Sequence, residues 1–230
     1  MSEVPKISEM DLSKMTVGEL KALCKELEVK GFSGKTKDQL IELLSSDPTP
    51  APKLQDTYTP EILKKRYASY LLATKELQAI NQETGLCIRG ANPPEDITEN
   101  MVKFILRKQG IDSSWARCIK TNGDLYSEKE KVQEVKSFTS DGPSSFGPKK
   151  KFNVIYFLDM RKWLDNQIVL WRVNLTNESA EWKKVAMNKN QTQEDQTDQG
   201  RRPHISWEKL YPQIKDHCSM IYDGSFEGIF

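Results

Sequence analysis

Apolar residues at the start of the chain recur with helical spacing. Intervals of three and four residues join them over 20–27 and again over 40–44, which predicts two short amphipathic helices. The capping-box sequence TVGE, residues 16–19, precedes the first run, and TKDQ, residues 36–39, precedes the second. Two glycines lie between the runs. We therefore expect a helix, a turn and a second helix.

A change in composition near residue 50 predicts a domain boundary. The sequence SSDPTPAPK, residues 45–53, combines prolines with small residues, which is typical of an extended linker. We predict a small helix-turn-helix domain over residues 1–47, a linker over 48–57 and a second domain over 58–230.

Helical spacing resumes after the linker. Thr59 and Pro60 supply a capping residue and a proline at the first helical position, and apolar residues from 62 to 80 are spaced to line one face. After a loop rich in glycine and proline, the segment 98–110 predicts another helix, capped by Thr98 and closed by Gly110.

Strand patterns dominate from residue 115 onwards. WARCIKT is followed by an Asn-Gly turn and then by VQEVKSF, which predicts a hairpin. FNVIYFLDM is a continuous apolar run typical of a central strand buried on both faces, and IVLWRVNL predicts the next strand. Helices are expected near SAEWKKVAM and SWEKL, with a polar loop over 188–203 between them. The expected fold is α/β (α+β), with a central mixed sheet flanked by helices.

Composition narrows the class of protein. The chain has 230 residues, 29% of them charged, and a net charge of +1, so binding to nucleic acid requires local basic patches. No apolar run approaches the length that spans a bilayer, and the first residues lack a signal-peptide pattern. We expect an intracellular protein, cytoplasmic or nucleoid-associated, that is not secreted.

The cysteines do not indicate a metal centre or a disulfide framework. Four cysteines lie far apart, at positions 24, 87, 118 and 218, and the chain has only two histidines. A zinc site needs more closely clustered ligands, and a disulfide scaffold would be smaller and richer in cysteine. We expect four reduced thiols, mostly buried.

Three charged residues carry the candidate chemistry. Glu134 and Lys136 share one face of the predicted strand because side chains alternate along it, and Asp124 follows the hairpin turn on the neighbouring strand. An acid and a base inside a sheet are costly unless they bind something. Carboxylates are suitable ligands for Mg²⁺, and a lysine beside them can orient or deprotonate a water. A structural salt bridge is the alternative.

The local context singles out this group. The chain contains four acid-x-Lys triplets, and three of them fall in or beside predicted helices, where solvated charge is ordinary. Only Glu134-x-Lys136 falls in a predicted strand, after a hairpin that carries a further acid.

The segment 11–44 resembles a SAP domain, the small helical unit of DNA- and chromatin-associated proteins. The two helices, their caps and the glycines at 31 and 34 carry the resemblance. It implies DNA binding near the start of the second helix, where Lys35 and Lys37 would contact phosphate. Residues 1–45 hold seven Lys and eight Asp or Glu, so an adaptor for protein contacts is the alternative.

The segment from residue 58 resembles the PD-(D/E)xK nuclease core, and in particular small type II restriction endonucleases. The hairpin with NGD, the strand QEVKSF, the sequence TSDGPSSFGP and the buried NVIYFLDM carry the resemblance. It implies that Asp124 and Glu134 hold Mg²⁺, that Lys136 positions the water and that Glu99 adds a helical acid to the site. Gly123 departs from the family pattern, in which proline often precedes the aspartate, and Glu99 would also simply favour the helix dipole.

Two further segments are expected to touch DNA. The loop after the predicted catalytic strand offers hydroxyls and lysines for phosphates and base edges, and the polar segment near residue 200 offers arginines and a histidine. The candidate contacts are Ser137, Thr139, Ser140, Ser144, Ser145, Lys149, Lys150, Arg201, Arg202 and His204. Solvated surface loops are the alternative for both segments.

Together these patterns predict a Mg²⁺-dependent, site-specific endonuclease of the type II restriction class that acts on double-stranded DNA. A symmetric site favours a homodimer, and a cognate DNA methyltransferase is expected in the same system. The alternatives are a structure-specific repair or junction-resolving nuclease and a non-enzymatic DNA-binding protein with a SAP domain.

Overall fold

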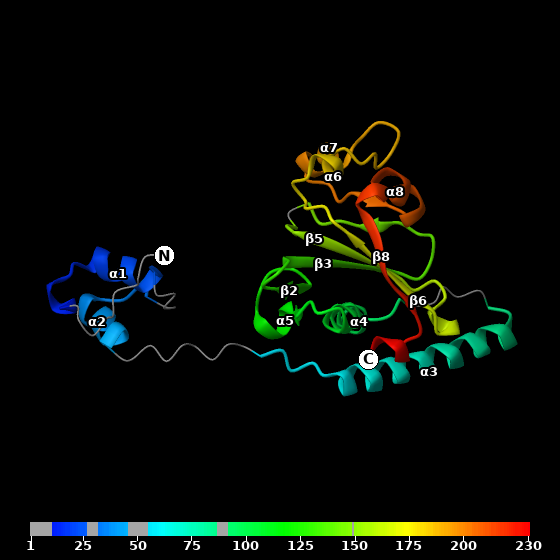
Figure 1. Cartoon of the computed structure of the whole chain (residues 1–230), viewed down its shortest axis with the longest axis horizontal. Coiled ribbons are helices and arrows are strands. Elements are labelled where there is room, and N and C mark those ends of the chain that lie inside the picture. Colours follow the sequence, from blue (N-terminus) through cyan, green and yellow to red (C-terminus); the bar gives the residue numbers. More distant parts are fainter. Residues whose placement is uncertain (1–10, 27–31, 46–54, 87–91, 149) are drawn as a thin grey trace. The chain divides into compact units, whose positions relative to one another are not determined.

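The chain divides into two compact units, Met1–Lys53 and Leu54–Phe230. The structure, a computed structural model, describes residues 11–26, 32–45, 55–86, 92–148 and 150–230. Each unit is described by itself below (Figure 1).

The first unit contains the two expected helices, α1 (Val17–Glu26) and α2 (Lys37–Ser45), after a short 3-10 turn, η2 (Leu12–Lys14). The first capping box forms in full: Thr16 N–H donates to Glu19 Oε2 at 2.7 Å, and Glu19 N–H donates to Thr16 Oγ1 at 3.3 Å. Thr36 N–H donates to Gln39 Oε1 at 3.1 Å. The apolar stripes of the helices pack into one small core, made of Leu12, Leu20, Leu23, Cys24, Leu40 and Leu44.

Two long helices begin the second unit. In α3 (Pro60–Thr84), Thr59 is the N-cap and accepts a hydrogen bond from Ile62 N–H, as the sequence predicts. The helix α4 (Glu95–Lys108) begins three residues before the predicted cap, Thr98. Pro94 is its N-cap. Proline suits the start of a helix because its ring fixes φ, and because the backbone N–H that it lacks would have no partner within the helix. Thr98 therefore lies buried inside the helix.

A six-stranded mixed sheet forms the centre of this unit, in the order β1-β2-β3-β5-β6-β8. Its strands β3 and β5 pair in parallel, and the other neighbours pair antiparallel. The bounds are β1 (Ser114–Trp115), β2 (Leu125–Ser127), β3 (Lys131–Phe138), β5 (Val154–Asp159), β6 (Ile168–Val173) and β8 (Cys218–Gly224). A separate pair, β4 (Ser144–Ser145) with β7 (His204–Ile205), lies outside the main sheet.

Helices cover both faces of the sheet (Figure 1). One core packs the sheet against α3 and α4, and includes Leu63, Met101, Val135 and Tyr156. The core on the other face packs the sheet against α6 (Ala180–Lys183) and α8 (Trp207–Ile214). The expected α/β fold, a central mixed sheet flanked by helices, is confirmed, and the apolar run of β5 is its buried central strand.

Two further local predictions are wrong, and one strand was missed. The strand expected over WARCIKT stops at Trp115, and Ala116–Ile119 form a helical turn, α5. The predicted Asn-Gly turn therefore leads into β2, which pairs with both β1 and β3, and the hairpin of β2 and β3 turns at residues 128–130 instead. The polar segment 188–203 contains a helix, α7 (Gln193–Asp198), whose capping box joins Thr192 to Asp195. The edge strand β8 was not expected, because its side chains are mostly half-buried or exposed and do not form an apolar run.

The apolar face predicted for α3 is only partly buried. Leu63 and Tyr67 lie in the core, whereas Ile62, Leu77 and Ile80 are exposed. The reason is visible in Figure 1: the second half of α3 runs beyond the sheet, where there is no core to pack against.

The remaining predictions from composition concern membranes and thiols. None of the helices in the described ranges is long and apolar enough to cross a membrane. Cys24 is buried, Cys118 and Cys218 are half-buried, and all three are free thiols. Cys87 lies outside the described residues.

Candidate active site

The three predicted catalytic side chains converge on the internal strand β3, beside the start of β2. Asp124 directly precedes β2, and Glu134 and Lys136 lie two residues apart on β3. Oδ2 of Asp124 accepts a hydrogen bond of 2.9 Å from the backbone N–H of Val135, which holds Asp124 against the strand between Glu134 and Lys136. Alternation along β3 places the other two on one face, where Lys136 Nζ lies 2.6 Å from Glu134 Oε1.

A second lysine completes this cluster. Lys150, from the loop before β5, places Nζ 2.8 Å from Asp124 Oδ1 and 2.9 Å from Glu134 Oε2. Its sequence signal was a run of lysines beside a turn, which indicated a DNA contact. That signal could not show the ion pairs, because they depend on how the loop folds back on β3.

Because these carboxylates are largely buried, their charges are stabilised mainly by the neighbouring ammonium groups and little by water. The side chain of Glu134 is 2% exposed, and that of Asp124 is 13% exposed. Burial by itself would lower the pKa of Lys150, but the hydrogen bond to Asp124 and the charge of Glu134 raise it above its ordinary value. The ammonium of Lys150 therefore stays charged at neutral pH and balances the two carboxylates.

Gly123 has a backbone that proline cannot adopt. Its φ is +88°, whereas the ring of proline holds φ near −65°. A Cβ at this position would also lie 2.7 Å from Val132 Cγ1. The departure from the family pattern thus has a physical cause in the turn that delivers Asp124.

Glu99 lies on α4 and makes its hydrogen bond outside this cluster. Its Oε2 accepts from the indole N–H of Trp115 at 2.6 Å. Burial, and to a smaller extent the charge of Asp124, raise the pKa of Glu99 to about 7. The structure therefore brings Glu99 within electrostatic range of Asp124 but gives it no hydrogen bond to the cluster. Its role in the metal site stays a prediction.

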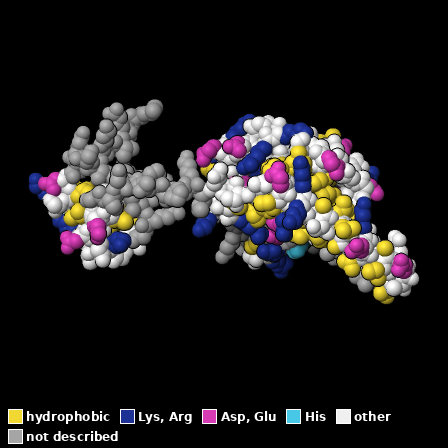
Figure 2. Space-filling model, turned by 90° about the horizontal axis from the view of Figure 1, so that it is seen from below, with side chains coloured by type: hydrophobic (Ala, Val, Ile, Leu, Met, Phe, Trp, Pro, Cys, Tyr) yellow, Lys and Arg dark blue, Asp and Glu magenta, His cyan; other side chains and the backbone are white. Residues whose placement is uncertain are grey.

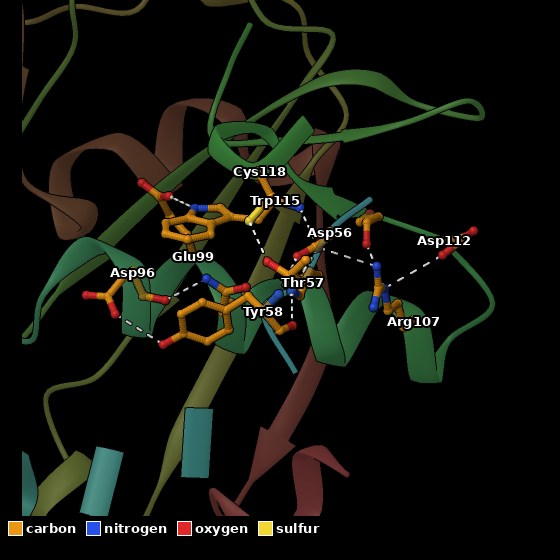
Figure 3. A network of polar contacts seen from close by, with 12 residues as sticks. Asp56, Thr57, Tyr58, Asp96, Glu99, Arg107, Asp112, Trp115 and Cys118 are labelled. Atoms are coloured by element: carbon orange, nitrogen blue, oxygen red, sulfur yellow. Dashed lines mark hydrogen bonds and ion pairs between the residues drawn. The ribbon is translucent and has the colours of Figure 1, made fainter. Parts of the chain in front are cut away.

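A polar network anchors Trp115 and hence the environment of Glu99 (Figure 3). The backbone N–H of Trp115 donates to Asp56 Oδ2 at 2.8 Å, and the fully buried Lys103 donates to the same oxygen at 2.9 Å. Asp56 falls within the predicted linker, 48–57, yet its carboxylate is buried in the second unit. The end of that segment is therefore part of the folded unit.

The carboxylates suit a hard divalent cation. Oδ1 of Asp124 and Oε2 of Glu134 both point at the same ammonium, so they are aimed at one point in space. Within the described ranges, no group of three or more His, Cys, Asp and Glu side chains is arranged to hold a metal ion. Two carboxylates are nevertheless enough for Mg²⁺, which keeps several waters and takes further oxygens from a substrate phosphate.

The structure places the two predicted DNA-contact segments side by side. Ser145 on β4 pairs with His204 on β7, and Ser144 pairs with Ile205. Arg201 and Arg202 precede this pair and are exposed. Thus residues almost 60 positions apart in the sequence form one surface, which the sequence alone did not indicate.

A hollow of about 220 Å³ lies next to this pair. Lys136 lines it together with all five candidate hydroxyl residues, namely Ser137, Thr139, Ser140, Ser144 and Ser145. The predicted catalytic lysine and the predicted DNA contacts therefore line the same hollow. Lys149 lies outside the described residues.

The two lysines of the first unit that are predicted to contact DNA, Lys35 and Lys37, are less accessible to a ligand. Lys37 Nζ donates to the backbone carbonyl of Ser13 at 2.8 Å, so this ammonium holds the unit together. Lys35 is half-buried in the turn before α2.

Fold and site together define the class: an α/β protein consistent with a restriction-endonuclease-like core. The model of the Bsp6I restriction endonuclease family matches residues 61–212, more than half of the chain, and the chain belongs to this family. The type II restriction enzyme Bsp6I of Bacillus sp. (strain RFL6) is 28% identical over 145 residues, which cover 62% of this chain and 76% of that enzyme.

The remaining comparisons concern the first unit and the known structures. Residues 11–46 match the model of the Rho termination factor N-terminal domain. This match covers the segment that resembles a SAP domain, and that resemblance stays a prediction. No solved structure matches the chain.

Proposed function

We propose that this protein is a Mg²⁺-dependent, site-specific endonuclease of the PD-(D/E)xK type that hydrolyses phosphodiester bonds of double-stranded DNA. Membership of a restriction endonuclease family supports the reaction class. The observation that carries the site is the convergence of Asp124, Glu134 and Lys136, with Asp124 held to the backbone between the other two.

Each member of this group has a defined task in the proposal. Asp124 and Glu134 hold the cation, which when bound neutralises charge on the phosphate and favours ionisation of a water. Lys136 orients the attacking water, a role that suits an ammonium 19% exposed beside a buried carboxylate; only as the neutral amine could the same side chain accept the proton of the water. The hydroxyls of the neighbouring hollow and the exposed Arg201 and Arg202 would bind the DNA.

The first unit is proposed to add a tethered DNA contact. Joined to the nuclease unit by a proline-containing segment, it would raise the local concentration of the enzyme on DNA. A cognate DNA methyltransferase would protect the host from such an activity, and a methyltransferase gene beside this one would support the restriction assignment.

The proposed assembly is a homodimer, in which each copy cuts one strand of a symmetric site. The exposed part of α3 is a suitable surface for a second copy. Within the described ranges, seven large hydrophobic residues are exposed, and five of them belong to α3 or follow it closely: Ile62, Leu72, Leu77, Ile80 and Leu86. Figure 2 shows hydrophobic side chains gathered along this projecting end.

Cleavage of plasmid and linear duplex DNA tests the proposal, with Mg²⁺ and with EDTA. We expect discrete fragments from the wild type with Mg²⁺ only. Asp124→Asn and Glu134→Gln should abolish cutting, and Lys136→Met should slow it about 100-fold or more. Glu181→Gln is the matched control, because Glu181 is an exposed acid that begins an acid-x-Lys triplet on α6; it should cut like the wild type.

The outcomes separate the candidate functions. Unchanged cutting by Asp124→Asn or Lys136→Met rejects the site. Cutting confined to branched or flapped DNA indicates a structure-specific nuclease instead. Binding of DNA that survives EDTA, without hydrolysis under any divalent metal, indicates a non-enzymatic DNA-binding protein.

A further inference from the structure

Lys150 occupies the point at which the two acidic side chains meet. Its ammonium makes hydrogen-bonded ion pairs with Asp124 Oδ1 at 2.8 Å and with Glu134 Oε2 at 2.9 Å. Glu134 forms a second ion pair, with Lys136. For Asp124, Lys150 is the ion-pair partner among the described residues. Without Lys150, two poorly solvated carboxylates would remain with the ammonium of Lys136, which pairs with Glu134.

The local backbone is shaped to deliver this side chain. The N–H of Lys150 donates to the carbonyl of Gly147 at 3.1 Å, which turns the loop toward β3. A Cβ at Gly147 would lie only 3.1 Å from Lys150 Cγ. A glycine at position 147 therefore leaves the passage through which the lysine stem reaches Asp124 and Glu134.

The same side chain has room to leave. Lys150 lines a cavity of about 190 Å³ beside Glu134 and a more open hollow of about 630 Å³ beside Gly123. Its side chain is 45% exposed, compared with 2% for Glu134. The ammonium can thus swing away from the carboxylates without disturbing the apolar core.

An ammonium and Mg²⁺ exclude each other at this point. Asp124 and Glu134 would hold Mg²⁺ through their carboxylate oxygens, and an oxygen of each carboxylate now contacts Lys150. Two cations beside the same carboxylates in a partly buried site repel each other strongly. Entry of the metal therefore requires the ammonium to move, and the ammonium then needs a new anion.

We infer that Lys150 is the internal counter-ion of the metal site in the DNA-free enzyme, and that its transfer to a DNA phosphate couples metal binding to DNA binding. This inference rests on the proposed nuclease function. A phosphate that attracts Lys150 frees Asp124 and Glu134 for the metal. By reciprocity, the metal releases Lys150 for the phosphate, so each ligand raises the affinity for the other by the same factor.

Calcium binding measured by calorimetry tests this role without relying on cleavage, since Ca²⁺ also takes carboxylate oxygens. In the absence of DNA, Lys150→Met should bind Ca²⁺ at least about 5-fold more tightly than the wild type, the lower end of typical coupling between sites. Lys150→Arg retains the charge and should bind like the wild type. The matched control is Lys151→Met, which removes the neighbouring exposed charge and should leave the affinity unchanged.

The coupling is measured by repeating the titrations with a saturating plasmid-derived duplex. DNA should raise the Ca²⁺ affinity of the wild type and of Lys151→Met, but change that of Lys150→Met by less than about 2-fold. Circular dichroism of each variant confirms that it is folded.

Failure of the inference differs from failure of the proposed function. If wild type and Lys150→Met bind Ca²⁺ equally, and Asp124→Asn abolishes binding to both, the metal site stands and the role of Lys150 is overturned. If neither protein binds Ca²⁺ or Mg²⁺, with or without DNA, the metal site is overturned and the inference with it.

Discussion

The indole N–H of Trp115 donates a 2.6 Å hydrogen bond to Oε2 of Glu99, inside a site where the carboxylate is only 6% exposed. One neutral donor does not replace the water that Glu99 loses on burial, so the pKa of Glu99 rises to about 7, helped by the charge of Asp124. The protonated form is the one that the folded state favours.

This relationship predicts a pH-dependent stability. The folded pKa lies above the unfolded value, so the folded state binds more protons between about pH 4.5 and 7, and stability falls as the pH rises through that window. Glu99→Gln removes this term. Relative to the wild type, its free energy of unfolding should rise by about 2–3 kcal/mol between about pH 5 and 8, measured by urea unfolding in EDTA.

The matched control for Glu99→Gln is Glu181→Gln, because Glu181 is an exposed acid on another helix, α6. Its stability difference from the wild type should change little with pH. A difference for Glu99→Gln that is equally independent of pH would show that Glu99 does not titrate in this range.

Gly123→Ala should destabilise the protein by at least about 1–3 kcal/mol. A φ of +88° strains any residue with a Cβ, and the added methyl would lie 2.7 Å from Val132 Cγ1 and 3.1 Å from the carbonyl oxygen of Gln133. Asp124 N–H donates to that same carbonyl at 3.0 Å, so the shift should also displace Asp124 and reduce cleavage.

Gly110→Ala separates the cost of a positive φ from the cost of a steric clash between the added Cβ and its neighbours. Gly110 has a φ of +79°, but nothing lies within 4 Å of the position of its Cβ. Its loss of stability in urea should therefore be smaller than that of Gly123→Ala, and its cleavage should be unchanged. Equal losses for the two variants would mean that the contact with Val132 costs nothing.

Sequence patterns predicted the features whose cause is local. The caps at Thr16 and Thr59 need only nearby backbone donors, and the pairing of Glu134 with Lys136 needs only the alternation of a strand. These interactions join residues two or three positions apart, so a short window of sequence contains every residue that forms them.

The features that were missed depend on distant parts of the chain. Lys150 meets Asp124 from 26 positions away, and Trp115 is held by Asp56 from 59 positions away. The strand β8 forms because β6 offers an edge with which it can pair, since its own side chains are only half-buried or exposed. Such contacts follow from the topology, which hydrophobic periodicity does not determine.

Asp56→Ala should be strongly destabilising. Lys103 is fully buried and donates to Asp56 Oδ2 and to the carbonyl of Tyr58. Removing the carboxylate leaves a buried ammonium without its counter-ion, which typically costs about 3–5 kcal/mol. Urea unfolding of the full-length protein measures the loss.

Two comparisons test the cause of that loss. Asp112→Ala removes an exposed partner of Arg107 and should cost less than about 1 kcal/mol. The double variant Asp56→Ala with Lys103→Met removes both charges and should be more stable than Asp56→Ala alone. If the double variant is the less stable of the two, the buried charge is not the source of the effect.

The projecting half of α3 should hold two copies together. Leu77 is 62% exposed and Ile80 is 51% exposed, and they lie on one side of the helix because three residues separate them by almost one turn. Three basic residues, 64–66, and one acid, Glu61, lie near the start of α3, whereas two acids, Glu76 and Glu83, and one base, Lys75, lie toward its end. An antiparallel pair of α3 helices therefore brings opposite charges together, whereas a parallel pair would place like charges side by side.

Leu77→Glu combined with Ile80→Glu should convert a dimer into a monomer, as measured by light scattering after size-exclusion chromatography. Both residues are exposed in the isolated chain, so folding should be retained, and cleavage of both strands at one site should give way to nicking or be lost. Met220→Glu is the control, because Met220 is 53% exposed on β8 rather than on α3. A wild type that stays monomeric at micromolar concentration with DNA present, or a double variant that stays dimeric, would exclude α3 as the contact between copies.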